Sequence, residues 1–67
     1  MTDMTPKEKI VYNTIKTIIK TEDVYCVHVT GIADEANLPI SVIKGCVGSL
    51  VKKNLIGEVE HNEFEAY

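Results

Sequence analysis

Apolar residues recur at helical spacing in two long segments, the first covering residues 6 to about 21. Its apolar stripe consists of Val11, Ile15, Ile18 and Ile19. Spacings of three and four residues place such side chains on one face of a helix. Thr5, Pro6 and Glu8 precede the stripe and match a capping box with proline at the first helical position. The pattern predicts a helix that begins at Pro6 and ends near Thr21.

The second segment covers residues 38–56, and the rest of the chain is organised around it. Its stripe consists of Ile43, Cys46, Val47 and Leu50. Pro39 suits a helix start, because its missing N–H would have no intrahelical partner there. Asn54 suits the position just past the helix end, since Asn tolerates the left-handed conformation that closes many helices. Lys52 and Lys53 would lie in the last turn, where the helix dipole favours cations.

The segments between and after these helices predict short elements. Residues 24–29 are rich in β-branched and aromatic side chains, which is typical of a strand or an extended connector. Thr30 is a candidate cap for a short helix over residues 31–36, which Gly31 weakens. Polar and apolar residues alternate over residues 58–67, and we expect a hairpin with His61 and Asn62 at its turn. Residues 1–4 are expected to form a frayed tail.

These elements predict a single domain over residues 1–67. The chain has 67 residues, of which 45% are hydrophobic, enough for one modest core. The expected fold class is α+β, with three helices and a small antiparallel sheet of two or three strands. No internal repeat or linker divides the chain.

Charge changes the functional picture, because the chain is acidic. Ten acids stand against seven bases, all of them lysines, and the formal net charge is -3. That balance argues against tight non-specific binding of nucleic acid, which depends on neutralising phosphates. Three of the lysines fall within residues 44–57, however, and residues 58–67 carry four glutamates and no base. The second long helix and the hairpin are therefore expected to carry opposite charge.

Side chains capable of chemistry are few. Cys26 and Cys46 lack the spacing of a metal or redox motif, and we expect both to be reduced thiols in a cytoplasmic protein. No signal peptide or membrane-length apolar run is visible. The sequence shows no catalytic constellation and no glycine-rich phosphate loop after a strand. We therefore expect no enzyme activity, cofactor, metal site, membrane contact or small-molecule substrate.

Two stretches resemble a known family. Residues 32–38, IADEANL, resemble the second helix and turn of bacterial winged-helix repressors of the multiple-antibiotic-resistance type. Residues 43–56, with the exit KKNLI, resemble the third helix of the same repressors and the segment that leaves it. The match covers roughly residues 10–60. The resemblance implies a winged helix-turn-helix domain whose wing is the hairpin over residues 58–67.

In such repressors the start of the third helix enters the DNA major groove, and the wing approaches the flanking backbone. The corresponding groove-facing residues here are Ile40, Ser41, Val42, Lys44, Gly45 and Gly48. Either Lys52 or the lysines of the first helix would reach the backbone. Only Ser41 and Lys44 are of types that read base edges. The glutamates of the wing would repel phosphate. The same surface could therefore bind DNA or a protein partner.

Gly45 and Gly48 leave two interpretations open. Each costs about 1 kcal/mol relative to Ala inside a helix, which is explained either by close packing against a neighbouring element or by close approach of a partner's backbone. The first functional hypothesis is a DNA-binding transcription regulator, acting as a homodimer because one copy offers few phosphate contacts. The second is an acidic protein-interaction module, of the size that phages encode, which does not bind DNA.

Overall fold

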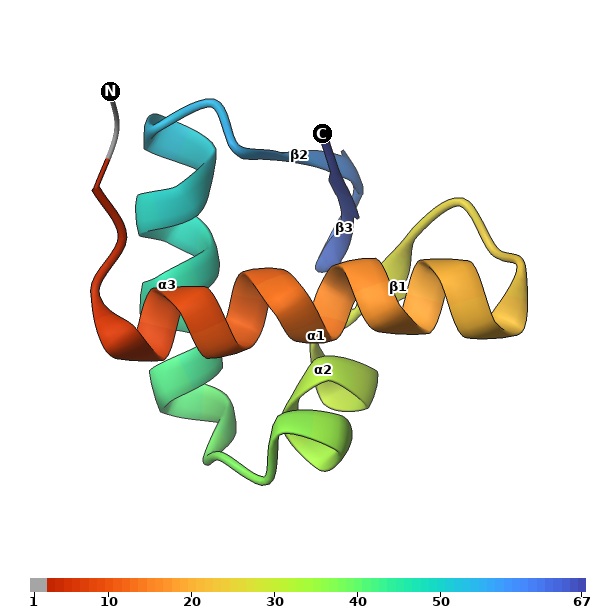
Figure 1. The fold of residues 1–67 in the computed structure, drawn as a ribbon, viewed down its shortest axis with the longest axis horizontal. Helices are drawn as coiled ribbons and strands as arrows, with labels where there is room; N and C mark the ends of the chain where they lie inside the picture. The colour runs from red at the N-terminus through yellow and green to blue at the C-terminus, as the bar shows by residue number, and fades with distance from the viewer. Residues whose placement is uncertain (1–2) are drawn as a thin grey trace.

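Across residues 3–67, the computed structural model contains three helices and one three-stranded antiparallel sheet, an α+β arrangement. The elements follow the order α1 (Pro6–Glu22), β1 (Val27–His28), α2 (Val29–Ala36), α3 (Ile40–Lys52), β2 (Ile56–Glu60) and β3 (Glu63–Ala66). In Figure 1, α1 runs horizontally, α2 lies below it, β2 and β3 lie above it and α3 stands on the left, while β1 is labelled at the level of α1. The expected fold class is confirmed at this level.

The predicted start of α1 is confirmed in detail. The Glu8 N–H donates to the Thr5 hydroxyl at 3.2 Å, and the Thr5 N–H donates to the Glu8 carboxylate at 2.9 Å. These two bonds form the reciprocal capping box. The helix ends at Glu22, one residue beyond the prediction, and Asp23 closes it in a left-handed conformation with φ of 55°.

The predicted ends of α3 are also confirmed. The Pro39 carbonyl accepts hydrogen bonds from the N–H groups of Val42 and Ile43 and so precedes the first turn. Asn54 adopts a φ of 62° just past the helix. The Leu55 N–H then donates to the Leu50 carbonyl at 3.1 Å, which is the bond of a Schellman motif. A left-handed Asn therefore directs the chain from α3 into β2.

The segment between α1 and α2 differs from the prediction. Only Val27 and His28 join the sheet, while Tyr25 is 94% exposed. The predicted Thr30 cap is wrong, because His28 caps α2 and its Nδ1 accepts from the Thr30 N–H at 3.2 Å. The helix begins earlier because Val29 is buried and its N–H donates to the Asn62 carbonyl of the hairpin turn. A long-range contact therefore decides this boundary.

The β2–β3 hairpin carries the expected turn at His61 and Asn62. β3 is the central strand, pairing Val27 of β1 with Phe64 and Ile56 of β2 with Ala66. An irregularity between Glu58 and Glu60 disturbs the pairing and leaves the side chain of Val59 47% exposed. The regular pairing of β2 with β3 is thus interrupted at Val59, as at a β-bulge.

The core draws on all six elements. Its buried apolar members are Val11, Ile15, Ile18, Val27, Val29, Ile32, Ile43, Val47, Leu50, Ile56 and Phe64. Met4, in the segment expected to be frayed, packs against this core, and the neighbouring Asp3 carbonyl accepts a bond from Lys53 at 2.8 Å. Residues 1–2 of the predicted tail lie outside the described residues. Within residues 3–67, no helix is long and apolar enough to cross a membrane.

Candidate interface on the third helix

The seven residues predicted for an interface all lie on α3. Six of them are exposed, and these are Ile40, Ser41, Lys44, Gly45, Gly48 and Lys52. Val42 is half-buried. The opposite face of the helix, formed by Ile43, Val47 and Leu50, is buried in the core. Six of the seven residues therefore share the outward side of one helix, and Val42 lies at the margin of that side.

The two glycines of α3 face open space. A Cβ placed on Gly45 or on Gly48 would have no neighbouring atom within 4 Å. The interpretation that these glycines allow another element of the fold to pack closely is therefore wrong. Each still costs about 1 kcal/mol of helix stability relative to Ala. The fold described here gives no reason for them, and a contact outside the fold remains the alternative.

A groove of about 430 Å³ runs between α3 and the β2–β3 hairpin. Its lining residues are Val29, Lys44, Val47, Gly48, Val51, Lys52, Glu58, Asn62 and Phe64. The floor is apolar, since Val29, Val47 and Phe64 are buried members of the core. Of the seven predicted residues, three line this groove. The other four lie on α3 outside it.

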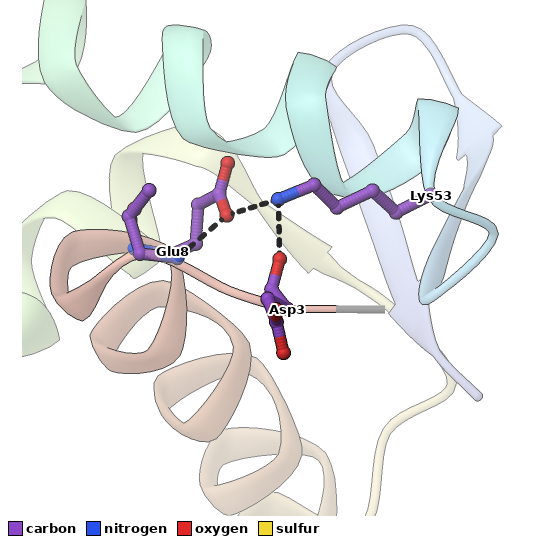
Figure 2. A network of polar contacts seen from close by, with 4 residues as sticks. Asp3, Glu8 and Lys53 are labelled. Carbon is purple, nitrogen blue, oxygen red and sulfur yellow. Dashed lines mark hydrogen bonds and ion pairs between the residues drawn. The ribbon is translucent and has the colours of Figure 1, made fainter. Parts of the chain in front are cut away.

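Charge on α3 is positive, with no acid anywhere in the helix. Among residues 3–67 the recorded ion pair joins Lys53 to Glu8, with 2.6 Å between Nζ and Oε1. Figure 2 shows the Lys53 side chain extending from the end of α3 to the carboxylate of Glu8 and the backbone oxygen of Asp3. The Lys53 ammonium group is therefore occupied by contacts within the protein. Lys44 and Lys52 remain exposed on the outward side.

The Glu8 carboxylate fastens the start of α1 to the end of α3. The bond from Lys53 lowers the pKa of Glu8 from its ordinary 4.5 to about 2, and the Ser49 hydroxyl and the Thr5 N–H act in the same direction. All three groups favour the charged carboxylate. This contact joins the end of α3 to the start of α1, because Ser49 lies in the last turn of α3 and Lys53 directly follows the helix.

The hairpin places carboxylates opposite the lysines of α3. Glu58 lines the groove, and one of its oxygens accepts the Asn62 N–H at 3.1 Å. Glu63 accepts a bond from the Cys26 thiol at 3.1 Å. That bond, burial and the charges of Glu60 and Glu65 raise the pKa of Cys26. The hairpin is therefore an acidic element whose carboxylates disfavour a thiolate at Cys26.

Three features of this region are absent from the sequence prediction. The pairing of Glu8 with Lys53 joins residues 45 positions apart, and nothing in the local pattern indicates it. The apolar floor contributed by Val29 and Phe64 depends on how α2 and β3 meet. The bond between Cys26 and Glu63 depends on the pairing of β1 with β3. Each follows from tertiary contact.

The exposed face of α3 and the groove beside it are suited to non-covalent binding. An exposed helix with two lysines, two uncovered glycines and an apolar groove beside it provides charge, close approach and buried apolar area for a partner. Among residues 3–67, no three His, Cys, Asp or Glu side chains form a cluster able to hold a metal ion. Comparisons of the chain with protein-family models, curated proteins and solved structures gave no match.

Proposed function

We propose that the chain is a winged helix-turn-helix domain that binds duplex DNA through α3 and regulates transcription without catalytic activity. The order α1–β1–α2–α3–β2–β3, with strands ordered β1–β3–β2, supports the winged-helix assignment. In that fold α2 and α3 form the helix-turn-helix and β2–β3 is the wing. The outward side of α3, where the predicted residues are exposed, is the side that enters the major groove in this class.

The uncovered glycines between two lysines carry this proposal. Lys44 and Lys52 are eight residues apart, or about 12 Å along the helix axis, and Gly45 and Gly48 lie between them with open space above their Cα atoms. DNA could approach this strip more closely than it could approach an ordinary helix. Lys52 would contact a phosphate, and Ser41 and Lys44 near the helix start would lie at the base edges.

The acidic wing limits how the DNA can be held. Glu58 and Glu60 are exposed on β2 and would repel a phosphate backbone. A single copy therefore offers few phosphate contacts, and its affinity is expected to be low at physiological salt. A homodimer that presents two α3 helices to two half-sites would compensate for this. The proposed DNA-binding species is accordingly a dimer.

A salt titration tests the proposal. Fluorescence anisotropy of labelled duplex DNA of mixed sequence should show binding at low salt that weakens steeply as salt rises. Replacing Lys44 or Lys52 by Ala should weaken binding and reduce the log–log salt slope by about 1 for each phosphate that the variant no longer neutralises. Lys20→Ala is the control, because it removes the same charge from the last turn of α1. In Figure 1 that end of α1 lies on the opposite side of the molecule from α3. No binding even at low salt would refute the proposal.

The second candidate function is a protein-interaction module on the same scaffold that does not bind DNA. It is favoured by one observation: exposed apolar side chains accompany the acidic hairpin and the start of α3. Ile40 is 40% exposed at the first residue of α3, and Val59 protrudes from β2 between two glutamates. Absence of DNA binding, together with dimers in light scattering that Gly45→Glu abolishes, would support this candidate.

A further inference from the structure

The groove between α3 and the hairpin has features that DNA binding does not explain. Its floor is formed by Val29, Val47 and Phe64, and apolar surface gives no gain against a phosphate backbone. One rim carries Lys44 and Lys52 and the other carries Glu58 and Asn62. A volume of about 430 Å³ is in the range of pockets that enclose a bulky side chain or a small ligand.

Gly48 borders this groove without a side chain. It lines the groove on the α3 side, between the two lysines in sequence, and no atom lies within 4 Å of the position that its Cβ would take. Any larger residue there would project into or beside the open space. Gly45, one turn earlier, has equally open surroundings but lies outside the groove. The two glycines are thus chemically matched but differ in whether they border the groove.

The lining selects the charge of an occupant. Two exposed lysines stand against one glutamate, and that glutamate already accepts the Asn62 N–H through one oxygen. The apolar floor requires an apolar group, and the lysines at either end of the α3 rim require anions. A chain segment with one large apolar side chain between acidic residues meets both requirements, because its anchor fills the floor while its carboxylates reach Lys44 and Lys52.

We propose that this groove is a docking site for an acidic segment of a partner protein, anchored by one large apolar side chain between Lys44 and Lys52. The segment lies along α3 over Gly48. Because it covers both lysines, it excludes DNA from the same helix. An acidic partner would thereby release the protein from DNA, while the docking itself requires no DNA binding and is measurable without it.

The probe is a panel of short, acetylated, fluorescently labelled peptides in which one Leu, Met, Phe or Trp stands between two pairs of Asp. Binding to the full chain is measured by anisotropy, and backbone amide shifts in NMR spectra locate the contact. At least one acidic peptide should shift the amides of Val47, Gly48 and Phe64. Otherwise identical peptides with Lys in place of Asp should bind more weakly.

The matched variants are Gly48→Leu and Gly45→Leu. Leu is a better helix former than Gly, and both sites are open, so both variants should fold, which circular dichroism checks. Gly48→Leu should weaken peptide binding by about tenfold or more, the scale of a blocked anchor site, while Gly45→Leu should leave the affinity unchanged. Lys44→Ala should weaken binding up to about fivefold, as expected for one exposed ion pair.

Three results would overturn the proposal. The first is that no acidic peptide of the panel binds. The second is that Gly48→Leu and Gly45→Leu weaken peptide binding equally, which would place the peptide on the exposed face of α3 that the two glycines share. The third is that duplex DNA alone shifts the amides of Val29 and Phe64, the two floor residues outside α3, which would make DNA the occupant. Failure of DNA binding with intact peptide binding would refute only the proposed function.

Discussion

Replacing both open glycines of α3 by Ala should stabilise the protein. Ala exceeds Gly by about 1 kcal/mol in a helix interior, and no atom lies within 4 Å of either new Cβ, so no clash offsets the gain. Gly45→Ala with Gly48→Ala should therefore raise the free energy of unfolding by about 2 kcal/mol, the sum of the two gains in helix propensity. At about 4–8 °C per kcal/mol for a domain of this size, the melting temperature should rise by about 8–16 °C.

Urea and thermal unfolding followed by circular dichroism measure this gain. The control is Gly57→Ala on β2, where a Cβ would collide with the Tyr67 hydroxyl. Because that tyrosine is largely exposed, its ring can move aside, and the control should show no gain or a small loss. The contrast separates open glycines in a helix from a covered glycine in a strand.

The result that would refute this reasoning is a double variant no more stable than the wild type. It would mean that Gly45 and Gly48 support a conformation of α3 that Ala cannot adopt. The same variant also tests function. If it gains stability yet binds DNA and the acidic peptides as tightly as the wild type, the space above the glycines is not used by either partner.

Three further predictions concern single side chains. The pKa of Glu8 is lowered from 4.5 to about 2, so its stabilisation is complete above pH 4.5 and is lost as pH falls towards 2; the urea midpoint should therefore fall less over that range in Glu8→Gln than in the wild type. Glu63→Gln should speed alkylation of Cys26 by iodoacetamide in a Cys46→Ser background, because Glu63 is the largest of the groups that raise the pKa of Cys26. Asn54→Ala should lower the free energy of unfolding by about 1 kcal/mol, measured in urea, because φ is positive there.

Each of these has a control of the same chemistry. Glu35→Gln removes an exposed carboxylate from α2 and should follow the pH dependence of the wild type; an equal change in both variants would contradict the role given to Glu8. Glu65→Gln should accelerate alkylation less than Glu63→Gln, since Glu65 acts on Cys26 through charge alone. Asn54→Gly should keep wild-type stability, and a loss as large as that of Asn54→Ala would contradict the backbone argument.

Helix boundaries set by local hydrogen bonds could be predicted from the sequence. Thr5 and Glu8 are three residues apart and bond to each other, so the capping box is visible in the sequence itself. Asn54 closes α3 through its own backbone conformation. The outward placement of Lys44 and Lys52 follows from helical periodicity once the buried stripe is known.

Features that depend on distant segments could not be predicted. Residues 24–29 have the composition of a strand, but only Val27 and His28 meet β3, and composition cannot tell how many residues will find a partner. The Asn62 carbonyl, which is distant in sequence, accepts a hydrogen bond from the Val29 N–H at the start of α2. The helix therefore begins at Val29, and His28 rather than Thr30 is its N-cap. The open space beside Gly48 depends on how α3 and the β2–β3 hairpin pack together, which the local sequence does not specify.

The proposed partners of α3 compete for the same lysines, and the two glycines can separate them. DNA approaching the helix from outside would meet a Leu at position 45 as well as one at position 48, because both face open solvent. A peptide in the groove would meet only the latter, since Gly45 is not part of the lining. Loss of DNA binding in both Leu variants, with loss of peptide binding in Gly48→Leu alone, would therefore identify two overlapping sites. If both Leu variants instead lose DNA binding and peptide binding alike, DNA and peptide share one contact surface on the exposed face of α3. The groove would then have no separate role.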